Sequence, residues 1–188
     1  MTVVPSQRAS VPGLNENMIL LAIENILVSI QPDNAPRLTT AGVSRNYTTA
    51  VQKVTRDRTV PADTIPSEHP FASVRRTSVS YEHSPSGRLM ATMEVELTLR
   101  VMAEDQYQAD AALHCFEDDV IAAMYSGYAM DPDNVSGDVS GYAHNVKLID
   151  TKENLVEGTN NQAESHMTWE IKFMRSTGKE VAHTGYNP

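Results

Sequence analysis

The sequence predicts an α+β fold in a single domain, with a mixed or antiparallel sheet and two main helices packed on one face. Three observations support this prediction. Two stretches repeat apolar residues at helical spacing, a long run alternates strictly after a turn, and no repeat of 20–50 residues is visible. The length of 188 residues fits one domain, 1–188. Residues 1–13 and 176–188 lack periodicity, so they are expected to be an N-terminal arm and a C-terminal tail flanking the core.

The first helix is expected from about Asn15 to Ile30. A short polar side chain at its start can accept a hydrogen bond from an unpaired backbone N–H. Pro32 ends the helix, because a proline disfavours helical geometry in the residue before it. Its apolar residues form one stripe that should be buried: Ile19, Ile23, Ile26, Leu27 and Ile30.

The second helix is expected to begin at Glu104 or Asp105 and to run to about Ser126. Gly127 is a plausible stop, since glycine favours the left-handed geometry found after helix ends. The predicted buried stripe is Ala109, Ala112, Leu113, Phe116, Val120, Ala123 and Met124.

A long β-hairpin is the strongest local signal. Residues 74–83 alternate, 84–87 (SPSG) supply a turn, and a second strand runs from Leu89 to Met102. Its odd positions from Leu89 to Val101 are all apolar and should face the helices. Its even positions carry Met90 and Met102 at the ends and polar side chains between them, and these polar side chains must meet water or a partner. These are the candidate channel or subunit-interface residues: Thr92, Glu94, Glu96, Thr98 and Arg100.

The remaining elements are predicted from composition. Residues 43–56 suit a partly exposed strand, because they are rich in Val, Thr and Tyr and contain no Gly or Pro. Residues 57–73 contain three prolines and are expected to be an irregular excursion. Two shorter strands are expected at 142–150 and 166–175, joined by a flexible polar connection.

The composition restricts the function classes. With 24 acidic and 15 basic side chains, the net charge is −9, which disfavours affinity through phosphate neutralisation. The single cysteine excludes an intrachain disulfide, and the longest apolar run, from Met18 to Ile23, is too short to span a membrane. No secretory leader is visible. We therefore expect a soluble protein made in a reducing compartment.

An acidic stretch extends from Glu104 to Asp138, with nine carboxylates and no Lys or Arg. One interpretation is a solvated helix face followed by an acidic loop. Another is a wall that repels a polyanion, or a surface for a basic partner. The sequence alone leaves these alternatives open.

No catalytic, cofactor-binding or metal-binding residue is predicted. His114 and Cys115 are adjacent on a predicted helix and point in different directions, so Cys115 is interpreted as buried packing. No histidine pair has a zinc-site spacing. Residues 131–142 match a calcium loop poorly and are interpreted as a capped turn. Phosphate-binding and nucleophile-elbow motifs are absent, and Glu94 and Glu96 are interpreted as solvation on an exposed strand, so the protein is expected not to be an enzyme.

The order of these elements resembles a known family. A helix (ENMILLAIENILVSI) precedes a proline-rich excursion and a long hairpin. The second hairpin strand (RLMATMEVELTLRVMAED) leads directly into a helix (ADAALHCFEDDVIAAM), and MTWEIKFM is a late strand. This pattern resembles the tail terminator proteins of long-tailed bacteriophages, which include the minor tail protein U type. The resemblance covers roughly residues 15–175. The arm, the excursion from Pro61 to Pro70 and the tail are additions to the compact pattern.

The resemblance implies a non-enzymatic ring, typically a hexamer, at the head-proximal end of the virion tail. Such a ring caps the tail tube, stops its polymerisation, contacts the head–tail connector and leaves a channel through which DNA passes without specific binding. No cofactor or membrane is implied. The acidic bias suits a channel that does not retain DNA.

Two further classes remain open. A tail-tube or head-to-tail connector subunit is the nearest alternative, and a tube subunit would form open-ended polymers rather than closed rings. A small ligand-binding α+β domain, or a hydrolase with scattered site residues, would be a monomer or dimer with a pocket.

Overall fold

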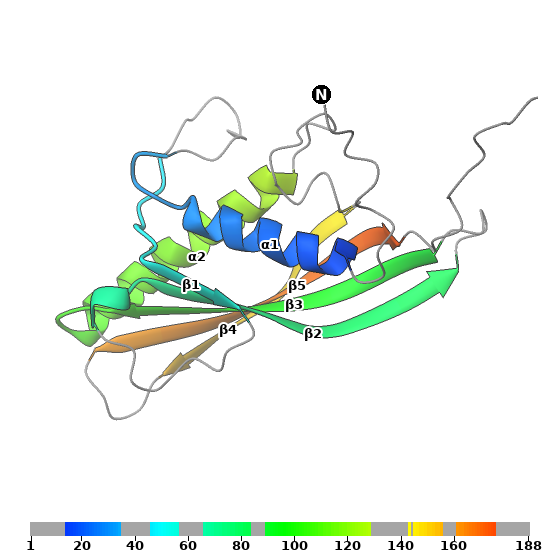
Figure 1. The fold of residues 1–188 in the computed structure, drawn as a ribbon. Coiled ribbons are helices and arrows are strands. Elements are labelled where there is room, and N and C mark those ends of the chain that lie inside the picture. The colour runs from blue at the N-terminus through cyan, green and yellow to red at the C-terminus, as the bar shows by residue number, and fades with distance from the viewer. Residues whose placement is uncertain are drawn as a thin grey trace, which may run out of the picture.

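The computed structural model describes residues 14–34, 46–56, 66–83, 89–128, 143, 145–155 and 161–175. It contains a twisted five-stranded sheet with two helices on one face (Figure 1). The strands are β1 (Lys53–Arg56), β2 (Phe71–His83), β3 (Leu89–Met102), β4 (Asn145–Leu155) and β5 (Gln162–Arg175). Their order in the sheet is β1-β2-β3-β5-β4, and only the β1–β2 pair is parallel. The predicted α+β class with a mixed sheet is confirmed. The expected arm, the hairpin turn and the tail lie outside the described residues.

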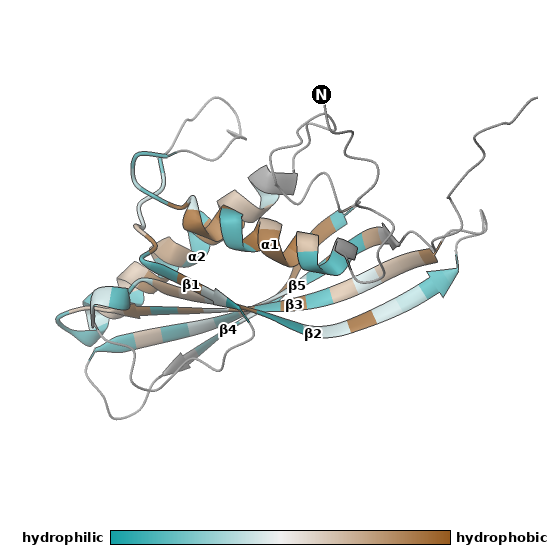
Figure 2. Cartoon of the chain, in the orientation of Figure 1, coloured by the Kyte–Doolittle hydropathy of each residue, from teal (hydrophilic) through white to brown (hydrophobic). Residues whose placement is uncertain are grey.

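Helix α1 spans Leu14–Val28, close to the predicted range. Its final turn closes with hydrogen bonds from the Ser29 backbone N–H and hydroxyl to the Ile26 carbonyl. All five residues of the predicted stripe are buried, as are Leu20 and Ala22. Figure 2 shows hydrophobic residues along this helix, which lies over the sheet. The apolar stripe therefore fixes the face by which α1 packs.

Helix α2 spans Gln106–Tyr128, and the Asp105 Oδ1 atom caps it by accepting a hydrogen bond from the Gln108 backbone N–H at 2.8 Å. The helix continues through Gly127, so the predicted stop is wrong. Ala112 and Cys115 are exposed, contrary to expectation. At about 100° per residue, Cys115 lies on the far side from the buried line through Leu113, and Ala112 lies at its margin.

The predicted hairpin is confirmed as β2 (Phe71–His83) and β3 (Leu89–Met102). The odd positions of β3 from Ala91 to Val101 are 0–1% exposed, whereas Leu89 is half-buried. Strand β5 (Gln162–Arg175) supplies the matching inner side chains Met167, Trp169, Ile171 and Phe173, all fully buried. Period-two alternation thus correctly identified the core face.

Two loop predictions were wrong because pairing recruits polar sequence into strands. Strand β4 spans Asn145–Leu155, and its residues 151–155 pair with 163–167 of β5. Most of the expected flexible connection 151–165 is therefore sheet. Likewise, 71–73 belong to β2 and 66–68 form a short 3₁₀ turn, not irregular structure. Backbone hydrogen bonds across the sheet require no apolar side chain, so hydropathy did not reveal them.

Of the predicted strand 43–56, Lys53–Arg56 form β1, residues 46–52 are not strand, and 43–45 lie outside the described residues. The preceding residues follow an irregular path in which the Tyr47 N–H donates to the Asn34 carbonyl and the Val51 N–H to the Ile30 carbonyl. Tyr47 and Val51 are nevertheless buried in the core. Burial and the neighbouring Asp119 carboxylate raise the pKa of Tyr47 to about 12. Among the described helices, none is both long and apolar enough to cross a membrane.

Candidate functional site: the polar face of the sheet

The five predicted residues of β3 all lie on the sheet face opposite the helices, but their environments differ. Glu94 is exposed, Thr92, Glu96 and Arg100 are half-buried, and Thr98 is buried. Cross-strand pairing places β2 on one side of them and β5 on the other. These neighbours divide the face into a distal part around Glu94 and a proximal part around Arg100.

In the distal part, Glu94 lies opposite Ser78 of β2 and Glu170 of β5. The Ser78 hydroxyl donates to Glu94 Oε2 at 2.9 Å. Two carboxylates directly opposite each other repel, but Lys172 Nζ lies 3.4 Å from Glu170 Oε1 and offsets part of that repulsion. Glu94 is therefore the most accessible negative charge of the predicted set.

In the proximal part, Arg100 forms a half-buried ion pair with Glu164 of β5. Arg100 Nε donates to Glu164 Oε2 at 2.8 Å, and its Nη2 donates to the same oxygen. Their side chains are only 11% and 12% exposed, so solvent screens this pair less than a surface pair. The Arg100 guanidinium group is therefore bound by a carboxylate of the same chain.

The network continues from Glu164 to His166. The second Glu164 oxygen, Oε1, lies 2.9 Å from His166 Nε2. The other ring nitrogen, Nδ1, lies 3.3 Å from Thr98 Oγ1 and 3.8 Å from Glu96 Oε1. Arg100, Glu164, His166, Thr98 and Glu96 therefore form one continuous polar network, which we call the Arg100 network.

Two ionisation equilibria are shifted at the proximal part of this face. Burial alone would raise the pKa of Glu164, but its hydrogen bond and charge interaction with Arg100, together with His166, hold that pKa below its usual range. His69 is buried with Nδ1 3.3 Å from the Arg100 carbonyl, and burial lowers its pKa. Glu164 thus favours its charged form, whereas His69 favours its neutral form.

The structure brings Glu96, Thr98 and Arg100 together and leaves Thr92 and Glu94 outside the network. Sequence reasoning missed Glu164 and His166 as their partners. A signal was present, because the alternation of β5 extends back to Ala163 and places polar residues at every even position: Glu164, His166, Thr168, Glu170 and Lys172. That signal was masked by the polar composition of 161–165.

The face carries both signs of charge rather than a single negative field. Arg75 of β2 lies opposite Glu96, and Lys147 of β4 lies opposite Glu170. Opposite charges on neighbouring strands reduce the potential that Glu94 and Glu96 could produce alone. A face of this composition can form complementary polar contacts with a partner, and it does not form a uniformly repulsive wall.

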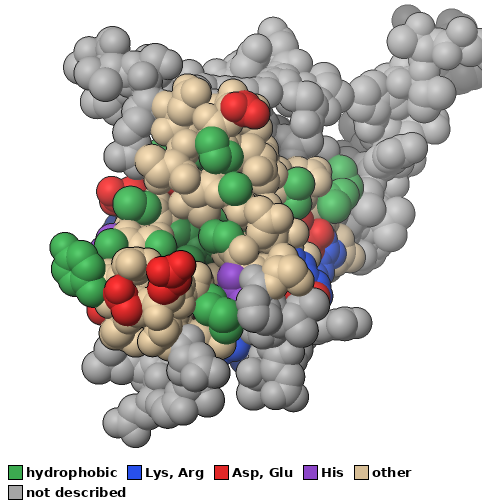
Figure 3. All heavy atoms as spheres, turned by 90° about the vertical axis from the view of Figure 1, so that its left-hand side faces the viewer, with side chains coloured by type: hydrophobic (Ala, Val, Ile, Leu, Met, Phe, Trp, Pro, Cys, Tyr) green, Lys and Arg blue, Asp and Glu red, His purple; other side chains and the backbone are tan. Residues whose placement is uncertain are grey.

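Where it is described, the acidic stretch is only partly a solvated helix face, since Glu104, Asp105 and Asp118 are exposed but two other carboxylates are not. Asp119 is 1% exposed and Glu117 is 8% exposed, so α2 buries two of its carboxylates. Figure 3, which views the left-hand end of Figure 1, shows separate acidic and hydrophobic patches among other polar atoms. Residues 129–138, including the expected acidic loop, lie outside the described residues.

Neither a protein-family model nor a curated protein sequence matches this chain. The fold and the polar face define an α+β protein with one helical layer and one open, mixed-charge sheet face.

Proposed function

We propose that this protein is a bacteriophage virion structural protein, a tail terminator that assembles into a closed ring, typically a hexamer. The ring would cap the tail tube at its head-proximal end, stop its polymerisation, contact the head–tail connector and leave a channel for DNA. The pattern resemblance described above motivates this proposal. One structural observation supports it most strongly: the distal edge of β2 pairs with no strand among the described residues.

Strand β1 pairs with β2 only from Phe71 to Val74. Beyond Val74, no strand among the described residues pairs with the same edge of β2, and its side chains to His83 are exposed except for half-buried Val79. Figure 1 shows the distal ends of β2 and β3 running past the end of α1. A long unpaired edge offers backbone N–H and C=O groups to another chain.

We assign this edge to a second copy of the chain. A contact between two different surfaces of identical subunits generates a ring when its rotation closes. The adjacent polar face supplies exposed charges of both signs, such as Arg75 and Glu94, for such a junction. Thr98 and Arg100 are engaged within their own subunit, and Glu96 contacts the same network through His166. Thr92 and Glu94 are therefore the members of the predicted set that lie outside the network and remain for the junction or the channel.

The passage of DNA is compatible with the overall charge. Counterions leave DNA when Lys and Arg side chains neutralise its phosphates. A chain with a net charge of −9 has little positive charge to do this, so the ring gains little affinity for the phosphate backbone. The protein would therefore guide DNA without retaining it.

The test is light scattering coupled to size exclusion, with negative-stain imaging of the tag-free protein. Closed rings of uniform mass are expected. The Ser80→Lys/Glu82→Lys variant places repulsive charge on the open edge and should remove the rings. The Gln108→Lys/Asp118→Lys variant makes the same charge change on the exposed side of α2 and should retain them.

Other assemblies would identify the alternatives. Open-ended tubes would favour a tail-tube subunit over a terminator. A parent protein that stays monomeric or dimeric at high concentration would overturn the ring proposal and favour a binding domain or an enzyme. Rings that survive the β2 change would show that the interface lies elsewhere.

A further inference from the structure

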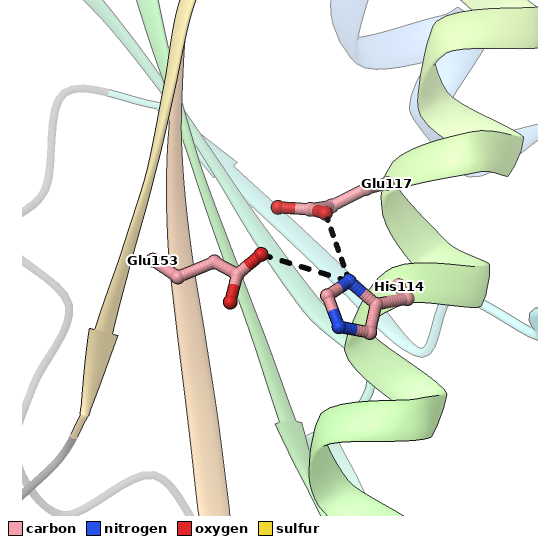
Figure 4. A group of neighbouring side chains, drawn as sticks. All are labelled: His114, Glu117 and Glu153. Atoms are coloured by element: carbon pink, nitrogen blue, oxygen red, sulfur yellow. Dashed lines mark ion pairs between the residues drawn. The ribbon is translucent and has the colours of Figure 1, made fainter.

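A second polar cluster lies on the helix side of the sheet, between α2 and β4. It consists of His114 and Glu117 of α2 and Glu153 of β4 (Figure 4). His114 Nδ1 lies 3.6 Å from Glu117 Oε2 and 3.6 Å from Glu153 Oε1. One ligand atom from each residue lies within 4.8 Å of the other two. Figure 4 shows the imidazole nitrogen between the two carboxylates.

Local structure explains how these residues meet. His114 and Glu117 are three residues apart and therefore share one side of α2. Glu153 pairs with Ser165 of β5, which is fully buried, so Glu153 lies on the helix-facing side of β4. No metal site was expected from the sequence, because no histidine pair has a zinc-site spacing and residues 131–142 match a calcium loop poorly. Neither pattern detects a His-x-x-Glu pair on a helix together with one distant carboxylate.

Glu117 provides an independent observation. The residue is only 8% exposed, and its Oε1 atom is buried without a hydrogen-bond partner among the described residues. A carboxylate oxygen taken out of water without a partner is unfavourable. The nearest described cationic or imidazole group, His114 Nδ1, lies 3.6 Å from the other oxygen, Oε2, and leaves Oε1 without a hydrogen bond. A cation bound between the three side chains would compensate the buried charge.

We propose that His114, Glu117 and Glu153 bind a divalent transition-metal ion of the zinc class. One imidazole nitrogen and two carboxylate oxygens are a donor set that zinc accepts, whereas calcium and magnesium prefer oxygen ligands alone. Tetrahedral ligands at about 2.0–2.2 Å from zinc lie roughly 3.3–3.6 Å from one another. The two His114–carboxylate distances already have this spacing. The ligand atoms of Glu117 and Glu153 lie within 4.8 Å of each other, and the exposed Glu153 side chain can adjust to the tetrahedral spacing.

The ion would join the middle of α2 to the edge strand β4. Three protein ligands leave a fourth position for water or an external group. An ion that binds the folded chain and not the unfolded chain raises the free energy of unfolding by mass action. This inference does not depend on the proposed ring.

The test uses the metal-stripped, tag-free full chain and zinc chloride alone. Calorimetric titration should give one zinc per chain, and thermal unfolding should shift upward with zinc concentration. His114→Ala and Glu153→Gln change exposed residues, so both variants should fold. Each should lose at least about tenfold in zinc affinity, the size of effect seen when even supporting residues of metal sites are changed.

Glu117→Gln keeps the side-chain shape and removes the buried charge. This variant should be at least as stable as the parent without zinc and should show no upward shift with zinc. His83→Ala and Asp33→Asn remove an exposed histidine and an exposed carboxylate outside α2 and β4 and should respond to zinc like the parent. Absence of binding up to millimolar zinc, or equal binding by the parent and by His114→Ala or Glu153→Gln, would overturn the proposal. Stronger stabilisation by magnesium than by zinc would overturn the assigned metal class.

Discussion

The Asp119 carboxylate binds Thr48 twice, with Oδ2 accepting hydrogen bonds from its backbone N–H at 2.8 Å and its hydroxyl at 2.9 Å. The same oxygen accepts a third hydrogen bond from the Thr49 N–H at 2.8 Å. Asp119 is 1% exposed. A single carboxylate of α2 therefore accepts three hydrogen bonds from the irregular segment that precedes β1. These hydrogen bonds hold the segment against the helical layer.

Asp119→Ala should lower the free energy of unfolding by about 2–3 kcal/mol, because it leaves the Thr48 and Thr49 donors without their acceptor. Chemical denaturation measures this loss. Asp118→Ala is the matched control, since Asp118 is the exposed neighbour on the same helix and should change stability by less than about 0.5 kcal/mol. Equal effects of the two substitutions would contradict the anchoring role of Asp119.

Leu97 is fully buried at the centre of β3. Leu97→Asp should prevent stable folding, because it places an unpaired charge in the core. Leu97→Ala should still fold and lose about 2–5 kcal/mol, as expected for a large-to-small core change. Thr92→Ala, on the opposite face of the same strand, should be nearly neutral in thermal and denaturant unfolding. A Leu97→Asp protein that melts within a few degrees of the parent would show that the facing assignment is wrong.

The ion pair between Arg100 and Glu164 should make stability depend on pH in the acid range. The folded-state pKa of Glu164 is below its ordinary value of 4.5, so this carboxyl binds fewer protons when folded. Its contribution to stability is complete above pH 4.5 and is lost as the pH falls through the folded-state pKa. Denaturation between pH 6 and pH 3, at intervals of about half a unit, should show a steeper acid loss in the parent than in Glu164→Gln. Parallel curves of unfolding free energy against pH for the two proteins would show that Glu164 does not contribute to the acid loss of stability.

Cys115 was expected to be buried and is instead exposed on α2. The native protein should therefore react with a thiol reagent to one equivalent without denaturant. Cys115→Ser should change the free energy of unfolding by less than about 0.5 kcal/mol, since exposed substitutions seldom do more. A thiol that reacts only after unfolding would contradict the exposed position.

Glu94 and Glu96 test the polar face in the proposed assembly. Glu94→Lys/Glu96→Lys should retain the fold, and it should either disturb ring closure or give the ring salt-sensitive affinity for DNA. Light scattering and DNA retention at low and moderate salt measure the two effects. The control is Lys147→Glu/Lys152→Glu, which reverses two charges on β4 of the same face. It shows whether any charge reversal on this face has the same effect on assembly. Unchanged mass together with no DNA retention would remove both residues from both roles.

Much of the fold was predictable because its signals are local. The stripe of α1 and the alternation of β3 each show which side of the element is apolar. The residues on that side are buried because the apolar side packs on the core. Asp105 was likewise recognisable as a helix cap, because the capping hydrogen bond spans three residues. Cys115 and Gly127 were misassigned, since the width of a buried face and the end of a helix depend on neighbouring elements.

The candidate site was less predictable, because its partners are distant in sequence. The pairing of β3 with β5 sets Arg100 beside Glu164 and Thr98 beside His166, and one shift in register would separate them. The packing of α2 on the sheet brings His114 to Glu153, a contact that no local pattern encodes. The sequence by itself determined the helices, the long hairpin and the apolar faces, since these follow from short-range periodicity. Only the tertiary structure decided which charges are buried and which pair, because the energy of a charge depends on the groups that folding places around it.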